Sequence, residues 1–277
     1  MTHFLADDGE KIHLKVSGEG PPMVLLHGWT SSHRDWNPFL AELEPHRRLY
    51  RWDARGHGGH RLETASVPTV ARMARDLQNL LDRHRLDRVV VAGHSMGALT
   101  LWQYLRDFGS SRLAKIVVID QSPRLVTDAG WPHGICGDFD EARNAAFIRA
   151  LEADFAEAVL RLVAFGHNAR ARQLYEENGP AIQSARQRLA SFDARALIEC
   201  WQSLTAADYR DVLPTIDVPA LLVYGGASNF YSTATAHYVR DRIPDARLHV
   251  YPDVDHAPHL WERARFVRDV LDFVAGG

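Results

Sequence analysis

Short apolar runs bounded by turn residues recur along this chain and alternate with longer stretches of helical periodicity. Runs of this length with no polar face are typical of parallel strands buried on both faces of a sheet. They lie at 23–26, 88–92, 115–119, 220–224 and 247–251. Residues 11–16 alternate between polar and apolar instead, which predicts an antiparallel strand at the sheet edge. The pattern predicts a mostly parallel sheet with helices on both faces.

The strand pattern is interrupted between residues 122 and 206, where the composition is helical. Within this stretch, 139–165 and 179–204 carry apolar residues at mixed spacings of three and four, as amphipathic helices do. We therefore expect a core formed by 1–121 and 207–277. The intervening residues, 122–206, are expected to form a helical cap over the sheet.

Composition and charge narrow the class of protein. Hydrophobic residues make up 46% of the 277 residues and charged residues 24%, which is typical of a globular protein. The formal net charge is −3, and the scattered Lys and Arg residues form no basic patch for nucleic acid. The sequence has no apolar run of about 18 residues to span a bilayer. It also lacks the pattern of a secretory signal, and Cys136 and Cys200 form no metal motif. We expect a cytoplasmic protein that acts on a small molecule, with no nucleic-acid or membrane partner.

The strongest chemical signal is the sequence Gly-His-Ser-Met-Gly at 93–97, which matches G-x-S-x-G and follows the predicted strand 88–92 directly. A helical stretch, 98–108, comes next. Strand, sharp turn and helix in this order are typical of a nucleophile elbow, which exposes the serine at the turn. The flanking glycines leave room where side chains would collide. We predict that Ser95 is a nucleophile.

A serine hydroxyl needs a base to take its proton. His256 is the best placed of the 15 histidines, because it lies in a loop after the last predicted strand and so near the carboxyl ends of the strands. For His259, its nearest competitor, we expect a packing role. The backbone N–H groups that stabilise an oxyanion are expected at Met96, directly after the nucleophile, and at Trp29, in the loop after 23–26.

These motifs resemble those of the α/β-hydrolase superfamily, in particular its esterases, lactonases and cofactor-free haloperoxidases with a helical cap. The resemblance covers essentially the whole chain, and the matching segments are 26–29 (Leu-His-Gly-Trp), 53–58 (Asp-Ala-Arg-Gly-His-Gly), 93–97 and 255–259 (Asp-His-Ala-Pro-His). It implies the α/β-hydrolase fold, a further strand before Asp53, and structural roles for Asp53 and Arg55. It implies no metal and no organic cofactor.

The acid of the catalytic triad is the point where the sequence departs from the family pattern. The family usually carries it three residues after the glycine that ends the penultimate strand, and that position here holds Ser228. An acid is needed to orient the imidazole and to stabilise its cation. Asp120 is our first candidate, because it ends a predicted strand and some of the similar haloalkane dehalogenases place their acid there. Asn229 and Asp255 are the alternatives.

A serine paired with a histidine predicts acyl transfer: attack on an ester or lactone carbonyl, an acyl-enzyme, and hydrolysis by water. Serine at the elbow argues against the related epoxide hydrolases and haloalkane dehalogenases, which use aspartate there. A perhydrolase that acts as a cofactor-free haloperoxidase and a non-catalytic ligand-binding protein remain alternatives, and a cap helix that pairs with its copy would give a homodimer. The aromatic candidates for an acyl pocket are Trp29, Trp131, Phe139, Phe165, Trp201 and Phe230.

Overall fold

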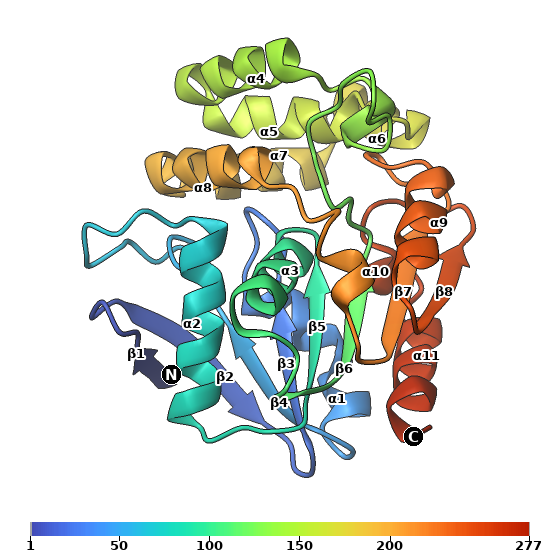
Figure 1. The fold of residues 1–277 in the computed structure, drawn as a ribbon. Coiled ribbons are helices and arrows are strands. Elements are labelled where there is room, and N and C mark those ends of the chain that lie inside the picture. Colours follow the sequence, from blue (N-terminus) through green and yellow to red (C-terminus); the bar gives the residue numbers. More distant parts are fainter. Residues whose placement is uncertain (1, 277) are drawn as a thin grey trace.

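The structure, a computed structural model, describes residues 2–276, and these form one eight-stranded sheet with the order β1-β2-β4-β3-β5-β6-β7-β8. The strands are β1 (Thr2–Leu5), β2 (Lys11–Ser17), β3 (Pro22–Leu26), β4 (Arg48–Trp52), β5 (Val89–His94), β6 (Leu113–Ile119), β7 (Ala220–Gly225) and β8 (Ala246–Tyr251). β2 runs antiparallel to both β1 and β4, whereas all other neighbouring strands are parallel. The sheet is therefore mostly parallel, as predicted (Figure 1).

All five predicted buried runs form strands, with bounds within two residues of those expected. The expectation that 11–16 form an edge strand was wrong, because β2 lies between β1 and β4. The alternation has another cause. Ile12 and Leu14 face the core, whereas Lys11, which precedes them, is exposed and His13, which lies between them, is only partly buried.

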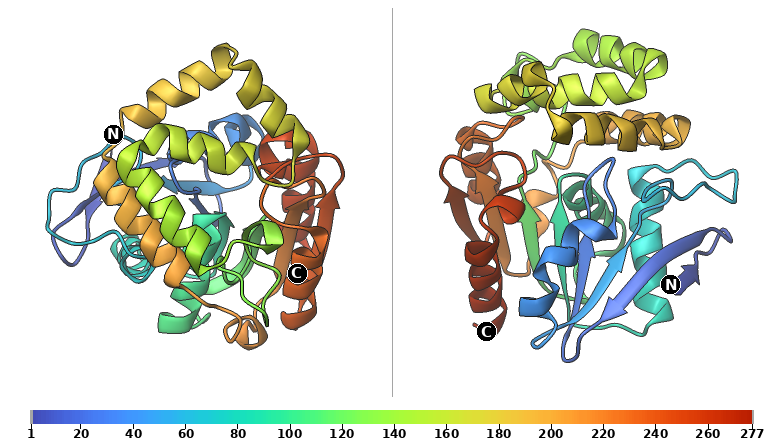
Figure 2. Two further views of the ribbon diagram at one scale, coloured as in Figure 1. Left: turned by 90° about the horizontal axis from the view of Figure 1, so that it is seen from above. Right: turned by 180° about the vertical axis from the view of Figure 1, so that it is seen from behind.

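Apolar side chains on both faces of the parallel strands form two cores. On β3, Val24 and Leu26 belong to one core, and the alternating Met23 and Leu25 belong to the other. The first core is covered by α2 (Val70–Arg83), α3 (Met96–Phe108) and α9 (Thr233–Arg242), and the second by α1 (Leu40–Leu43) and α11 (Arg263–Ala275). Figure 2 shows α1 and α11 on the face seen from behind. Helices on both faces of such a sheet make an α/β architecture.

Between β6 and β7 the chain forms a layer of helices above the sheet (Figure 1). They are α4 (Glu141–Ala153), α5 (Phe155–Ala164), α6 (Ala169–Glu177), α7 (Pro180–Ala190) and α8 (Ala194–Ala206). Asp140 and Asp154 directly precede α4 and α5 as N-cap residues, and their side chains accept hydrogen bonds from amides in the first turn at 2.9 and 3.0 Å. Such caps satisfy amides that a helix leaves without partners. The layer joins the first core through Phe155, Trp201 and Leu204.

Short helical segments complete the chain. They are α10 (Pro258–Trp261) and three 3₁₀ turns in the described residues, His33–Phe39, Ile135–Gly137 and Leu213–Thr215. No helix within residues 2–276 is both long and apolar enough to cross a membrane. Nor do His, Cys, Asp and Glu side chains in this part of the chain gather in a group of three or more that could hold a metal ion.

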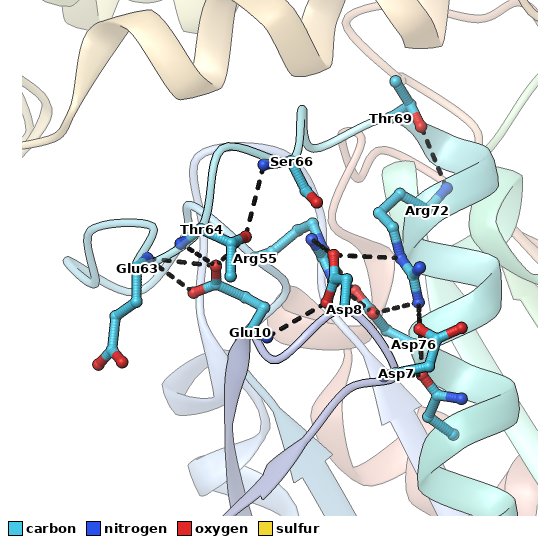
Figure 3. Close-up of polar contacts among 11 residues, drawn as sticks. Asp7, Asp8, Glu10, Arg55, Glu63, Thr64, Ser66, Thr69, Arg72 and Asp76 are labelled. Carbon is cyan, nitrogen blue, oxygen red and sulfur yellow. Dashed lines mark hydrogen bonds and ion pairs between the residues drawn. The ribbon is translucent and has the colours of Figure 1, made fainter.

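A cluster of ion pairs fastens the β1–β2 hairpin to the loop after β4 and to α2 (Figure 3). The side chain of Arg55 is fully buried, and its guanidinium pairs with Asp76 at 2.6 Å and with Asp8 at 2.9 Å. Glu10 accepts a hydrogen bond from the Thr64 amide at 2.9 Å. A buried charge is tolerated only when it is paired. Arg55 therefore has a structural role here, in line with the family resemblance.

Candidate active site

Ser95 stands at the sharp turn between β5 and α3. Its backbone angles are φ 53° and ψ −118°, a conformation that costs L residues about 1–3 kcal/mol. A Cβ on Gly93 would lie 2.5 Å from the backbone of Gly97, and a Cβ on Gly97 would lie 2.4 Å from the Leu26 carbonyl oxygen. Only glycine fits at both positions, so the turn that exposes Ser95 depends on them. This is the geometry expected of a nucleophile elbow.

His256 and Asp120 meet although they come from distant parts of the chain. The His256 Nδ1 atom lies 2.8 Å from Asp120 Oδ2. Asp120 directly follows β6, is completely buried and has a φ of 44°. His256 lies between β8 and α10 and lines the same cavity as Ser95. No hydrogen bond between Ser95 Oγ and the imidazole is found among residues 2–276, and in unliganded enzymes such catalytic contacts are often long.

The other two candidate acids face elsewhere. Asn229 Oδ1 accepts a hydrogen bond from the backbone N–H of His256 at 3.4 Å, and Asp255 Oδ1 accepts one from an amide in its own loop at 2.9 Å. Ser228, at the usual position of the family acid, donates a hydrogen bond to Asp120 Oδ2 at 2.7 Å. The family pattern points to this position but not to its partner. The pairing of β6 with β7 was the signal that could have found it, because it brings the two loops together.

Two further histidines, His94 and His259, lie near His256 and contact each other. The His94 Nε2 atom lies 2.9 Å from the His256 carbonyl oxygen, so this nitrogen carries a proton and donates it. His259 is completely buried, and its ring packs against Trp36 and Phe39, which agrees with the packing role expected of it. The contact of His94 was missed, because no local pattern signals a partner 162 residues away.

Burial controls the protonation of the pair. It lowers the pKa of His256 to about 4, partly opposed by the charge of Asp255, so the imidazole is neutral at pH 7. Burial also raises the pKa of Asp120 well above its usual value, against hydrogen bonds from Ser228 and Gly225. Both pKa shifts disfavour the state in which His256 and Asp120 are charged at the same time. The two groups therefore share one proton, which lies between Nδ1 and Oδ2. With that proton on Nδ1, the Nε2 atom has a lone pair and can act as a base.

A cavity of about 390 Å³ opens above Ser95 and is lined mainly by apolar side chains. Of the aromatic candidates, Trp29, Trp201 and Phe230 line it, as expected. Helices α5 and α8 supply part of its wall, through Val159, Leu162, Val163, Trp201 and Leu204. The cavity therefore lies between the strand ends and the helical layer.

The two amides expected to bind an oxyanion belong to residues that line this cavity. Met96 begins α3, and Trp29 lies in the loop after β3. Neither amide has a hydrogen-bond partner in the described part of the chain. Amides at the start of a helix lack intrahelical acceptors, so they can bind an anion.

Three aromatic candidates do not line the cavity, and their assignment to the pocket was wrong. Trp131 packs against Tyr238, with ring centroids 4.8 Å apart. Phe139 packs edge-on against Trp201 from outside the cavity, with ring centroids 6.2 Å apart. Phe165 is 45% exposed to solvent. Periodicity predicts which residues share a helix face, but it does not predict which face meets the cavity.

Comparison with known proteins agrees with this architecture. Residues 21–263 match the family model of the alpha/beta hydrolase fold. The pimeloyl-[acyl-carrier protein] methyl ester esterase of Vibrio vulnificus (strain YJ016) is 29% identical, over 95% of this chain and 97% of that protein. A non-heme haloperoxidase of Rhodococcus erythropolis is 28% identical, over 99% of each chain. The solved structure of an esterase from Exiguobacterium antarcticum has the same fold, with a TM-score of 0.85, 24% identity and 99% of each chain covered. The chain belongs to the α/β-hydrolase family, and it is an ester-cleaving hydrolase.

Proposed function

We propose that this protein hydrolyses small carboxylic esters or lactones through an acyl-enzyme, with Ser95 as nucleophile, His256 as base and Asp120 as acid. The observation that carries the proposal is the 2.8 Å contact between His256 Nδ1 and Asp120 Oδ2. The His256 ring lines the same cavity as Ser95, which stands on a strained turn. Each group supplies what the chemistry needs: an exposed hydroxyl, a neutral imidazole and a buried carboxyl that fixes the ring.

In the first step, Ser95 Oγ attacks the carbonyl carbon of the substrate while His256 Nε2 accepts the hydroxyl proton. The tetrahedral intermediate then collapses, the C–O bond to the alcohol breaks, and the imidazolium returns its proton to the leaving oxygen. Water attacks the acyl-enzyme in the same way, with His256 again as base, and releases the carboxylic acid and free Ser95. In a lactone the leaving oxygen stays attached to the acyl chain, so one hydroxy acid is released.

Negative charge builds on the carbonyl oxygen during both attacks. The N–H groups of Met96 and Trp29 are the donors for this oxygen, because they belong to cavity residues and have no other acceptor in the described structure. The loss of one such donor costs about 10²–10³-fold in kcat in other hydrolases. Backbone donors are fixed before the reaction and need no reorganisation as the charge forms.

The helices within 122–206 act as a cap in this proposal. Trp29 connects these helices to the loop after β3, which carries one of the two oxyanion donors, since its indole N–H donates to the Leu197 carbonyl of α8 at 2.9 Å. Its ring also packs against Trp201, with centroids 4.8 Å apart. The cap therefore closes the cavity and supplies the apolar wall against which an acyl or alkyl group binds. Substrate preference then follows from the residues of α5 and α8.

A panel of short and medium acyl esters, lactones and thioesters tests the proposal, with p-nitrophenyl esters for a direct reading. We expect ester or lactone turnover by the wild type and none above background by Ser95→Ala. The matched control is Ser110→Ala, because Ser110 bonds Asp217 away from the cavity, and it should keep full activity. Ligand binding without turnover would favour a non-catalytic binding protein and would refute the proposal.

A perhydrolase activity is the second candidate, favoured by the likeness to the non-heme haloperoxidase. Hydrogen peroxide would replace water in the attack on the acyl-enzyme, and the peracid formed would oxidise bromide. The same Ser95 and His256 would serve. Bromination that requires both acetate and peroxide and is lost in Ser95→Ala would establish it, whereas bromination that persists in Ser95→Ala would refute this route.

A further inference from the structure

Asn229 lies at the junction of the β7–α9 loop, the cap and the loop of His256. Its side chain is buried, at 2% exposure. The amide Nδ2 donates to the Val163 carbonyl at 2.9 Å, and Oδ1 accepts from the His256 backbone N–H at 3.4 Å. One side chain thus connects the last turn of α5 to the loop that carries the proposed base.

The α5 end of this connection belongs to the cavity wall. Val159, Leu162 and Val163 all line the cavity, so a bound acyl or alkyl group contacts this helix. The last carbonyls of a helix have no intrahelical donor. Asn229 supplies a donor to one of them, and the end of α5 is fixed as a result.

The His256 end completes a set of three attachments. Asp120 holds the ring through Nδ1 at 2.8 Å, His94 holds the carbonyl oxygen at 2.9 Å, and Asn229 holds the amide at 3.4 Å. The contact with Asn229 is the longest of the three. It is also the attachment that leads to the cap, since Asp120 and His94 both belong to the ends of core strands.

Backbone contacts fix the same junction from the cap side. The Asn229 carbonyl accepts a hydrogen bond from the His167 amide at 2.8 Å, and Asn168 Nδ2 donates to the Ala227 carbonyl at 2.9 Å. A Cβ on Gly166 would lie 2.0 Å from the Asn229 carbonyl oxygen, so only glycine allows this approach. The segment after α5 therefore lies directly against the β7–α9 loop.

We propose that Asn229 is a positioning residue that couples the end of α5 to the backbone of His256, so that the placement of the base depends on the position of the cavity wall. In this proposal the triad acid is Asp120, so the β7–α9 loop does not supply one. The loop instead carries Asn229, whose side chain joins the cap to the backbone of the base. The coupling rests on the proposed function, since it acts through His256.

The test compares Asn229→Ala with the wild type on a short p-nitrophenyl ester. A base displaced by a fraction of an ångström loses turnover, and we expect kcat to fall about 10- to 100-fold. KM should change by less than about threefold, because the variant removes no contact with substrate. The acid limb of the kcat/KM profile should also move upward, because a less restrained imidazole is better solvated. Asn79→Ala is the matched control, since Asn79 lies on α2 and bonds the Asp7 amide outside the cavity.

Asn229→Asp separates the two arms of the connection. It keeps an acceptor for the His256 amide and removes the donor to Val163, with almost no change of shape. If the link to α5 positions the base, kcat on the pH plateau falls in this variant too. Either wild-type kcat in Asn229→Asp or an unchanged acid limb in a folded Asn229→Ala would overturn the proposal. If Asn229→Ala does not fold, the plateau kcat of Asn229→Asp decides alone.

A readout without turnover keeps this proposal separate from the proposed function. NMR titration of the His256 imidazole gives its pKa directly, and in Asn229→Ala this pKa should rise from about 4 toward the ordinary value near 6.5. A wild type that hydrolyses no ester would refute the proposed function. An unchanged His256 pKa in folded Asn229→Ala would refute the coupling.

Discussion

Ser228 donates a hydrogen bond to Asp120 across 2.7 Å, although 108 residues separate them in the sequence. Ser228 occupies the position of the usual family acid, and Asp120 is the acid proposed here. Both follow neighbouring parallel strands, β6 and β7, whose carboxyl ends meet at the same edge of the sheet. A carboxyl group at the end of either strand can therefore reach the same imidazole. In this chain the carboxyl group follows β6, as Asp120, and Ser228 after β7 donates a hydrogen bond to it.

Replacement of Asp120 by Asn should lower kcat by about 10⁴-fold, as loss of the triad acid does in other serine hydrolases. The amide nitrogen can donate to Nδ1, which moves the imidazole proton to Nε2 and removes the base. The measurement is the kcat for a p-nitrophenyl ester. Near-normal turnover by Asp120→Asn would exclude Asp120 as the acid.

Adding Ser228→Asp to Asp120→Asn should restore part of the lost turnover. The Ser228 hydroxyl already touches the Asp120 oxygen that bonds His256, so a carboxylate at 228 lies near the ring. We expect a gain of at least about 10-fold over Asp120→Asn, equal to 1.4 kcal/mol of transition-state stabilisation. Ser228→Ala in the same background is the control and should give no gain. Equal rates for the two double variants would show that residue 228 cannot reach the imidazole.

The acid limb of kcat/KM should lie below the pKa of about 6.5 of an ordinary histidine. Burial lowers the pKa of His256 to about 4, and only the neutral ring accepts a proton from Ser95, so activity falls as the pH drops through this value. The charge of Asp255 raises the pKa of His256, and Asp255→Asn should move the limb lower still. A limb at or above 6.5 in the wild type would contradict the burial of this ring.

Replacement of Arg55 by Ala should lower the free energy of unfolding by about 3–5 kcal/mol, because it leaves the carboxylate of Asp76 buried without its partner. Urea denaturation gives the value. The exposed pair of Arg172 with Glu176 is the control, and Arg172→Ala should cost no more than about 1 kcal/mol. A loss from Arg55→Ala as small as that of the control would show that the cluster in Figure 3 contributes little to stability.

Local sequence patterns were enough to predict the sheet and the elbow. The buried strands read as apolar runs, and the motif around Ser95 combines a strand, two obligatory glycines and a helix in consecutive residues, so its geometry is set by neighbours in the chain. The position of His256 followed from one further rule, that loops after parallel strands meet at one edge of the sheet.

What could not be predicted depends on contacts between distant segments. The rings of Trp131 and Phe139 have the same apolar character as that of Trp201, yet only Trp201 faces the cavity, because α8 forms part of the cavity wall. The proposed role of Asn229 in joining α5 to His256 could not be predicted from the sequence either. Its side chain bonds residues 66 positions before it and 27 positions after it, and no periodicity records such a junction.

The most direct test of the account is covalent labelling of the nucleophile. A fluorophosphonate probe should modify the wild type at one site, and mass spectrometry of the digested protein should place the label on Ser95. His256→Ala should be labelled far more slowly, because the serine then has no base. Prior incubation of the wild type with an ester that it hydrolyses should also slow the labelling. A label on another residue, or ester turnover by Ser95→Ala at the wild-type rate, would contradict the account.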